Sequence, residues 1–330
     1  MKKILMIATG GTIASKNSGA GLAPAISSKE LLACVPELKE KCEIETLQPF
    51  NLDSTNLYAP HWLALVRIIE ENYSGYDGFV ITHGTDTMAY TAAALSYLIE
   101  NCNKPIVLTG SQKSAYLRDT DARKNLYDAF SYCADDGAHG VHVVFDGKVI
   151  LGTRAKKTRT QSFNAFSSVD FPEIAIMRDG EPLYYIRDAA PVGEPKFYHA
   201  LNEKVFVLKM IPGMRAEILD YLGEYYDGIV IESFGAGGLP NYEDDAFYTS
   251  MKRLLDKGKT VVLTTQVERE GSTLDKYEVG RRIRECGNVL EARCMTLEAT
   301  VVKLMCILSR AKSEREVEEL FYRPVNRDIF

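Results

Sequence analysis

A chain of 330 residues is long enough for two hydrophobic cores of ordinary domain size. Hydrophobic residues make up 46% of it and charged residues 25%, which is the composition of a globular protein and excludes a disordered or fibrous one. The net charge of -6 gives no electrostatic gain on a phosphate backbone, so we expect no nucleic-acid partner.

The first apolar run of the chain, Ile4–Ala8, follows a short basic start. It is shorter than the roughly 7–15 apolar residues of a secretory signal, and it ends at Thr9 and two glycines. It therefore predicts a buried strand. No run of about 18 apolar residues occurs, so we expect no membrane span and no membrane partner.

Short runs rich in β-branched residues then alternate with helical patterns through the first half. The runs predict strands at Phe79–Thr82 and Ile106–Thr109, and helices near Ser28–Cys34, over Met88–Asn101 and over Asp121–Ala134. Val141–Phe145 and Val149–Leu151 predict a hairpin, because Asp146-Gly147 between them suits a type I′ turn. The alternation predicts right-handed βαβ units and a largely parallel sheet.

The alternation breaks off where prolines and glycines interrupt a stretch without periodicity. We take residues 191–204 as a linker between an α/β domain of residues 1–190 and a second α/β domain of residues 205–330. The second half predicts strands at Val205–Ile211, Gly228–Glu232 and Thr260–Thr264. Residues 226–231 repeat the pattern of residues 76–81, either through a shared βαβ plan or through convergence of two buried strands that follow turns.

Thr9–Ala14, which reads T-G-G-T-I-A, follows the first predicted strand, where open α/β sheets bind ligands. The paired glycines let backbone N–H groups come close to a ligand, and Thr12 presents a hydroxyl beside them. The spacing is not the G-x-G-x-x-G of a dinucleotide site. A plain tight turn is the alternative.

His83–Thr87, which reads H-G-T-D-T, lies at the end of the second predicted strand and just before a helix. A threonine there could simply cap the helix, with Asp86 favourable in its first turn. The alternative is functional, because a hydroxyl beside a carboxylate at the carboxyl end of a strand is an arrangement that acyl transfer uses.

Two further segments admit both interpretations. The cationic run Arg154–Arg159 is either a solvated loop or the source of a lysine that serves Thr85 and Asp86 as a proton acceptor. Asn51–Asn56 alone predicts only a turn or a helix cap. Seven scattered cysteines without a C-x-x-C pair and five histidines without H-E-x-x-H spacing predict no disulfide framework and no metal site.

Together these segments resemble the bacterial-type L-asparaginases of the asparaginase/glutaminase family. The resemblance rests on Thr9–Ala14, His83–Thr87, T-G-S-Q at Thr109–Gln112 and the segment 143–166, and it extends over the whole chain. Without a signal peptide, the chain looks like the cytosolic, type I branch. The resemblance implies a larger N-terminal catalytic domain, a smaller C-terminal domain, and a homodimer or homotetramer with active sites at subunit contacts.

The family's residue roles carry over to the matching positions of this chain. Thr12 matches the primary nucleophile, and Thr85, Asp86 and Lys157 match the second threonine with its aspartate and lysine. The matching substrate-binding positions are Gly11, Asp53, Ser54, Thr55, Gly84 and Ser111. The resemblance implies hydrolysis of L-asparagine to L-aspartate and ammonia through an acyl-enzyme, with weaker activity on glutamine and without a metal or cofactor.

The sequence departs from the family in three places. A loop tyrosine common after the nucleophile is missing, and we hypothesise that Tyr277, from the same or the neighbouring subunit, fills its role, against a plain packing role. Lys113-Ser114 follows T-G-S-Q where an apolar residue and a proline are common, and the corner Gly235–Gly238 lacks the family's asparagine.

Two other functions compete with that of an asparaginase. The ammonia-generating subunit that serves glutaminyl-tRNA synthesis carries an extension ahead of T-G-G-T-I-A, whereas this segment begins here at residue 9. A non-catalytic amino-acid sensor would not need Thr12, Thr85, Asp86 and Lys157 intact. Both are therefore less favoured expectations.

Overall fold

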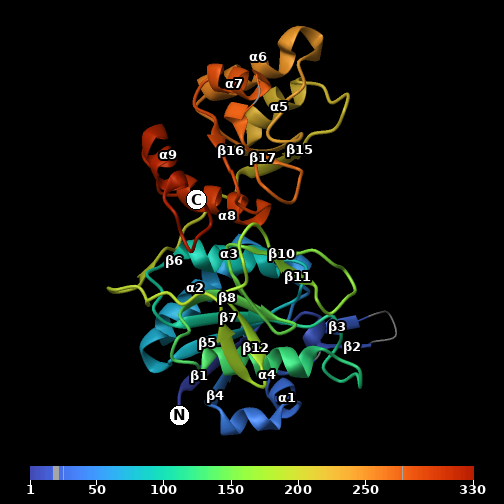
Figure 1. The fold of residues 1–330 in the computed structure, drawn as a ribbon, viewed down its shortest axis with the longest axis vertical. Helices are drawn as coiled ribbons and strands as arrows, with labels where there is room; N and C mark the ends of the chain where they lie inside the picture. Colours follow the sequence, from blue (N-terminus) through green and yellow to red (C-terminus); the bar gives the residue numbers. More distant parts are fainter. Residues whose placement is uncertain (18–21, 25, 277) are drawn as a thin grey trace. The chain divides into compact units, whose positions relative to one another are not determined.

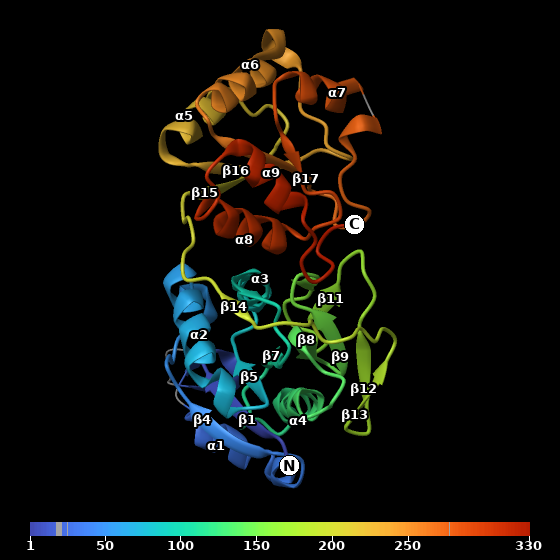
Figure 2. The same ribbon diagram turned by 90° about the vertical axis from the view of Figure 1, so that its left-hand side faces the viewer.

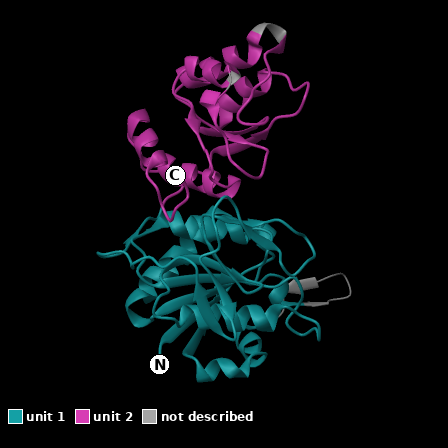
Figure 3. Cartoon of the chain, in the orientation of Figure 1, with its two compact units in different colours: residues 1–199 teal, residues 200–330 magenta. Residues whose placement is uncertain are grey.

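The computed structural model describes residues 1–17, 22–24, 26–276 and 278–330. They divide into two compact units, Met1–His199 and Ala200–Phe330 (Figure 3). The first unit contains a largely parallel sheet and the second a parallel one, which confirms the predicted class of two α/β domains with the larger one first. The division falls inside the predicted linker 191–204. None of the described helices is long and apolar enough to cross a bilayer.

The first unit is built on an eight-stranded sheet. Its strands, in spatial order, are β13 (Glu181–Tyr184), β12 (Ala175–Arg178), β9 (Lys148–Leu151), β8 (Gly140–Phe145), β7 (Pro105–Thr109), β5 (Gly78–Thr82), β1 (Lys3–Ala8) and β4 (Glu43–Leu47). The five strands from β8 to β4 run parallel, and β9, β12 and β13 add antiparallel pairs. The predicted hairpin is confirmed, with Asp146 and Gly147 at φ 50° and 75° as a type I′ turn requires.

Three short strand pairs lie outside this sheet: β2 (Ser15–Asn17) with β3 (Leu22–Pro24), β10 (Ala155–Lys157) with β11 (Phe166–Ser168), and β6 (Ile99–Glu100) with β14 (Lys196–Phe197). The last pair corrects one prediction. The helix expected over Met88–Asn101 ends at Leu98, because the next two residues pair with Lys196 and Phe197 as a strand.

Helices cover both faces of the large sheet. The helices are α1 (Ser28–Ala33), α2 (Ala59–Asn72), α3 (Met88–Leu98) and α4 (Ala122–Cys133), with 3-10 turns η1 (Thr12–Ala14), η2 (Pro36–Glu40), η3 (Ser54–Asn56) and η4 (Tyr73–Gly75). Figures 1 and 2 show α2 and α3 on one face of the sheet and α1 and α4 on the other. This is the layering that alternating strands and helices predict.

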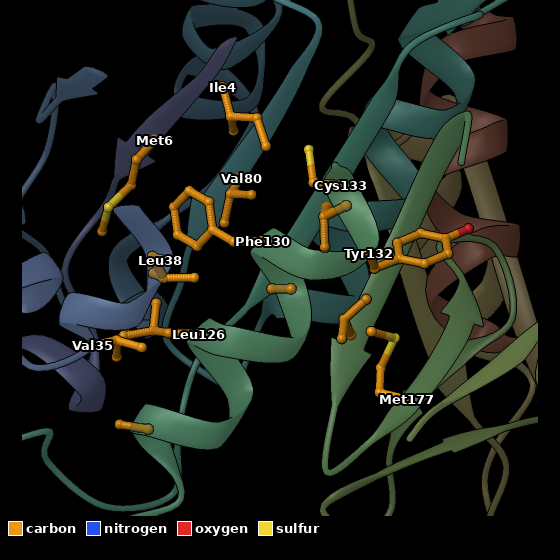
Figure 4. Close-up of a cluster of buried hydrophobic side chains, with 14 of the residues drawn as sticks. Ile4, Met6, Val35, Leu38, Val80, Leu126, Phe130, Tyr132, Cys133 and Met177 are labelled. Carbon is orange, nitrogen blue, oxygen red and sulfur yellow. The ribbon is translucent and has the colours of Figure 1, made fainter. Parts of the chain in front are cut away.

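The core between the sheet and α4 is closely packed (Figure 4). Side chains of a strand alternate between the two faces, so Ile4 and Met6 of β1 point to the same side as Val80 of β5. Leu126 and Phe130 of α4 pack against them, all fully buried. Burial of each such side chain stabilises the fold by about 1.5–3 kcal/mol. The close packing therefore holds the strand ends, from which the polar loops start, in fixed positions.

The second unit is a smaller version of the same layering. Its strands β15 (Val205–Lys209), β16 (Gly228–Ser233), β17 (Thr260–Thr265) and β18 (Leu290–Glu291) are parallel neighbours in that order, so the three strands predicted here are confirmed. Its helices are α5 (Glu217–Tyr225), α6 (Tyr242–Asp256), α7 (Glu278–Glu285), α8 (Leu297–Leu308) and α9 (Glu314–Tyr322), with the turn η5 (Leu274–Lys276). In Figure 2, α5 and α6 lie on one face of the sheet and α8 on the other.

Candidate active site

The candidate site lies at the carboxyl edge of the neighbouring parallel strands β1, β5 and β7. Hydrogen bonds between backbones continue past the ends of these strands. Thr9 N–H donates to the Thr82 carbonyl at 3.0 Å, and His83 N–H donates to the Thr109 carbonyl at 2.8 Å. The loops that follow the three strands therefore begin side by side, at the edge where open α/β sheets bind ligands.

Two glycines let three of the loops touch. A Cβ on Gly11 would lie 2.4 Å from the Gly84 Cα, and a Cβ on Gly84 would lie 2.6 Å from the Ser54 Cβ. Gly11 also has φ 79°, a conformation that favours glycine. The T-G-G-T, N-L-D-S-T-N and H-G-T-D-T segments thus meet at a point where no larger residue fits, and Thr12 and Thr85 each follow one of the touching glycines.

Lys157 reaches this point from the β10–β11 pair, which lies outside the main sheet. Its Nζ donates to Thr85 Oγ1 at 2.7 Å and to Asp86 Oδ1 at 2.6 Å. The Lys157 side chain is 16% exposed, so its charge is largely removed from solvent, while Asp86 stays 56% exposed. The lysine predicted to serve Thr85 and Asp86 is therefore in direct contact with both.

Backbone donors are available beside these side chains. Gly11 donates to the Leu52 carbonyl at 2.9 Å, and the Gly11 carbonyl accepts from Ser15 Oγ at 2.9 Å, so the turn before Thr12 is fixed. Within the part of the chain that the structure describes, the N–H groups of Thr12 and Thr85 have no hydrogen-bond acceptor. Two such donors next to each other can stabilise an oxyanion.

The predicted substrate-binding segment forms the turn η3. Asp53 caps it by accepting hydrogen bonds from Thr55 N–H at 2.9 Å and from Thr55 Oγ1 at 2.7 Å. Ser54 is buried against Gly84, and its carbonyl accepts from Thr87 Oγ1 at 2.7 Å. The structure therefore brings Ser54 directly to the centre, whereas the Asp53 carboxylate is engaged in holding Thr55.

The fourth loop carries Ser111 and two residues that the sequence did not single out. Ser111 is buried, and the next residue, Gln112, accepts a long hydrogen bond from Thr85 Oγ1 at 3.4 Å. The Asp121 carboxylate accepts from the N–H groups of Gln112 at 2.9 Å and of Lys113 at 3.0 Å. Asp121 precedes α4 and could be predicted as a cap, but its grip on this turn depends on tertiary contact.

The departure at Lys113-Ser114 has a structural role. The Ser114 hydroxyl donates to the Ser15 carbonyl at 2.5 Å, and Ala115 N–H donates to the Ile13 carbonyl at 3.2 Å. This segment therefore braces η1, the turn that carries Thr12, in place of the apolar residue and proline common in the family.

His83 also lies at the centre, although the sequence suggested no role for it. It is fully buried, with Nδ1 2.7 Å from the Gly84 carbonyl oxygen and Nε2 2.8 Å from Thr91 Oγ1. Burial lowers the pKa of the imidazole to about 4, so the ring is neutral near pH 7. A histidine directly after a fully buried strand is the signal that could have identified it.

Two predicted features belong to the second half of the chain. Tyr277 lies outside the described residues. The Gly235–Gly238 corner follows β16 in the second unit and lines a hollow of about 320 Å³ together with Phe234, Thr273, Leu274 and Gly280. No group of three histidine, cysteine or acidic side chains gathers as metal ligands among the described residues.

Comparisons with known proteins agree with the sequence motifs. The family model "Asparaginase, N-terminal" matches residues 3–190, and "Glutaminase/Asparaginase C-terminal domain" matches residues 204–321. An L-asparaginase of Thermococcus kodakarensis is 38% identical over 99% of both chains. The solved structure of the thermostable L-asparaginase from that organism superposes with a TM-score of 0.94 over 99% of both chains, at 38% identity. A glutamyl-tRNA(Gln) amidotransferase subunit of Pyrococcus furiosus is 36% identical over 96% of this chain and 74% of its own length.

Proposed function

Because the chain belongs to the asparaginase/glutaminase family and is an amidohydrolase, we propose that it hydrolyses L-asparagine to L-aspartate and ammonia with Thr12 as the nucleophile. The observation that carries the proposal is the cluster at the strand ends. Lys157 holds Thr85 and Asp86, and Gly84 touches the glycine that precedes Thr12. Two hydroxyls, an amine and a carboxylate around one point suit acyl transfer.

In the first half-reaction, Thr12 Oγ1 attacks the carbon of the substrate's side-chain amide. The new C–O bond gives a tetrahedral oxyanion, which the N–H groups of Thr12 and Thr85 stabilise, by about 3–4 kcal/mol for each well-placed donor. The C–N bond then breaks. The nitrogen leaves as ammonia with the proton that the Thr12 hydroxyl gave up, and the aspartyl group stays on Thr12 as an ester.

In the second half-reaction, water attacks the ester carbon. Its proton passes through the Thr85 hydroxyl and the Lys157 amine and returns to Thr12 Oγ1 as the C–O bond breaks, which releases aspartate. The 2.7 Å contact between Lys157 Nζ and Thr85 Oγ1 supports this relay. Asp86, bound to the same amine, keeps Lys157 in place.

The amino-acid part of the substrate needs partners for one positive and one negative charge. We assign the α-ammonium to Asp86, whose carboxylate is more than half exposed, and the α-carboxylate to the turn η3 around the buried Ser54. Gly11 and Gly84 give the substrate access to backbone N–H groups, and Asp53 and Thr55 shape the turn.

The Ser111 carbonyl accepts a hydrogen bond from the nitrogen of the substrate's side-chain amide. Such contacts fix the scissile bond against Thr12.

Several finer features belong to the same proposal. We assign the role of hydrogen-bonding the Thr12 hydroxyl to Tyr277 of the same or the neighbouring subunit. We further propose that the enzyme is of the type I branch, works in the cytoplasm as a homodimer or homotetramer, and uses residues 191–204 as the link between its domains.

A second candidate function is release of ammonia from glutamine for a transamidation complex. The 36% identity to a glutamyl-tRNA(Gln) amidotransferase subunit supports it. The two functions differ in the preferred amide, because an ammonia-supplying subunit would favour glutamine or act only with its partner.

The test measures ammonia release by the purified full chain with asparagine and with glutamine, for the wild type and for Thr12→Ala. We expect a higher kcat/KM for asparagine and at least a 10³-fold loss of kcat in the variant, since the ester cannot form. Unchanged turnover by Thr12→Ala would remove the nucleophile assignment. A preference for glutamine would favour the second candidate.

A further inference from the structure

His83 connects the buried interior of the first unit to the backbone beside the reacting threonines. We propose that His83 is a positioning residue that aims the Thr85 N–H at the oxyanion, so that this donor is in place before substrate binds. The inference rests on the proposed function, which makes that N–H part of the reaction centre. Three side chains from three elements carry it: His83 after β5, Thr91 of α3 and Trp62 of α2.

The hydrogen bonds of this chain fix which ring nitrogen carries the proton. The Gly84 carbonyl can only accept, so His83 Nδ1, 2.7 Å away, must donate to it. In a neutral ring Nε2 is then an acceptor, and it receives the Thr91 hydroxyl proton at 2.8 Å. The Thr91 oxygen in turn accepts the Trp62 indole N–H at 3.0 Å. Every donor has one acceptor, so the arrangement specifies a single tautomer and ring orientation.

The same arrangement resists protonation of the ring. A charged His83 would donate from both nitrogens, so Nε2 could no longer accept the Thr91 hydroxyl proton and that hydrogen bond would be lost. Burial adds to this by lowering the pKa of His83 to about 4. The ring therefore donates from Nδ1 alone throughout the neutral range, which suits a fixed support better than a proton carrier.

The hydrogen bond to the Gly84 carbonyl sets the direction of the Thr85 N–H. A trans peptide unit is planar, and its C=O and N–H point in opposite directions. Because the Gly84 carbonyl turns inward to the buried His83 ring, the N–H of the same peptide turns away from the interior. In the described part of the chain it meets no protein acceptor there. Glycine at position 84 would otherwise allow this peptide to rotate, since it lacks a Cβ.

Two substitutions of His83 separate positioning from plain packing. His83→Phe keeps an aromatic ring in the core but removes the donor to the Gly84 carbonyl. His83→Asn loses ring volume, yet its side-chain amide nitrogen occupies the place of Nδ1 and can donate to the same carbonyl. A role in packing alone predicts that the asparagine variant is the worse one, whereas a positioning role predicts the opposite.

The kinetic test compares kcat and KM for asparagine in the wild type and both variants, at a temperature where circular dichroism shows each folded. We expect His83→Phe to lose about 30- to 100-fold in kcat with KM within about threefold, because losing a fixed oxyanion donor costs about 10²–10³ in kcat. His83→Asn should be at least tenfold more active than His83→Phe. A smaller ratio between the two variants overturns the proposal.

A spectroscopic test reports on the amide itself. The sequence contains only three glycine–threonine steps, at residues 11–12, 84–85 and 152–153. Labelling glycine with 13C at the carbonyl and threonine with 15N therefore yields three filtered amide signals, from Thr12, Thr85 and Thr153. L-Aspartate, the product, should shift the Thr12 and Thr85 signals of the wild type and leave Thr153 unmoved.

In His83→Phe we expect L-aspartate to shift Thr12 but to lose most of its effect on Thr85, and in His83→Asn to shift both. A Thr85 response in His83→Phe equal to that of the wild type would refute the positioning role. If L-aspartate shifted neither signal in the wild type, or if the wild type released no ammonia from asparagine, the proposed function itself would be at fault, so the two failures are distinguishable.

Discussion

The two units of the molecule place equivalent strands in equivalent register. In the first, Phe79 of β5 pairs with Leu5 of β1 and with Ile106 of β7. In the second, Ile229 of β16 pairs with Phe206 of β15 and with Val261 of β17. The repeated sequence patterns at 76–81 and 226–231 thus occupy the same position in two parallel sheets, which favours a shared βαβ plan over convergence.

The loops after these strands differ between the two units. After β5 the chain continues with His83, Gly84 and Thr85, where the hydroxyl of Thr85 is bound by Lys157. The position that corresponds to His83 is Ser233, the last residue of β16, whose hydroxyl donates to the Thr264 carbonyl of the neighbouring strand at 2.6 Å. The same order of strands therefore carries the contacts of Lys157 with Thr85 and Asp86 in one unit and a glycine-rich corner in the other, so the loops distinguish the two units.

The largest expected effect comes from removing the Lys157 amine, which contacts both Thr85 and Asp86. Lys157→Met leaves Thr85 Oγ1 and Asp86 without their shared partner, so proton transfer through Thr85 fails. We expect kcat for asparagine to fall by about 10³-fold, within the range that general acid–base groups contribute. Stopped assays of ammonia release measure it.

Lys156→Met is the matched control. It removes the same charge from the adjacent residue of β10, but neighbouring strand residues point to opposite sides, so this side chain faces away from Thr85. We expect its kcat to stay within about threefold of the wild type. Equal losses in the two variants would mean that general electrostatics, and not the Lys157 contact, supports activity.

The sequence predicted the strands β1, β5 and β7 and the loops that follow them. Each of these strands is a short apolar run that is followed by glycine, threonine or histidine. Thr12, Thr85 and Asp86 were identified in this way, and Lys157 came from the family motif. The sequence could not predict that Lys157 reaches Thr85 from a two-stranded extension, because the β10–β11 pairing joins segments on either side of a loop without apolar alternation.

The hydrogen bonds that support His83 could not be predicted from the sequence either, because they depend on how helices pack. Trp62, Thr91 and His83 meet only when α2 and α3 pack on the same face of the sheet. Trp62 alone is indistinguishable from an ordinary core residue. The predicted end of α3 lies three residues too late, because only tertiary pairing with Lys196–Phe197 turns Ile99–Glu100 into a strand.

The second prediction concerns the buried charges of the second unit, which should serve stability and not catalysis. Lys303 of α8 and Asp328 near the C-terminus are 2% and 0% exposed and lie 2.7 Å apart. Lys303→Met would remove the ammonium group that lies against the buried Asp328 carboxylate. We expect the free energy of unfolding to fall by about 3–5 kcal/mol, measured by urea denaturation.

Activity should distinguish this change from the one at Lys157. In Lys303→Met the kcat of the folded fraction should equal that of the wild type, and adding Asp328→Asn should recover part of the lost stability by removing the buried carboxylate charge that Lys303 faces in the wild type. If kcat fell as much as we expect for Lys157→Met, the Lys303–Asp328 pair would also support catalysis. The proposal that catalytic groups belong to the first unit alone would then be wrong.

The smallest expected effect is on the pH dependence of stability, which should arise from the first unit because all five histidines precede residue 200. Burial lowers the pKa of His83 to about 4 and of His142 to about 3, so both rings stay neutral in the folded protein at pH 5. In the unfolded chain they titrate near 6.5 and take up protons as the pH falls. The unfolded state therefore binds more protons between pH 6.5 and 4, and stability is lost as the pH decreases through this window.

From pH 7 to pH 5, each buried ring should lower the free energy of unfolding by roughly 2 kcal/mol. His142→Phe keeps the edge-on contact with the Tyr132 ring, at 5.3 Å between centroids, but removes one titrating group. It should reduce the loss of stability between the two pH values by about 2 kcal/mol, since all other titrating groups are shared with the wild type. Urea denaturation of both proteins at pH 7 and pH 5 gives this difference directly. Equal losses in the two proteins would show that His142 is already charged in the folded state, and the first unit would then need another source of acid sensitivity.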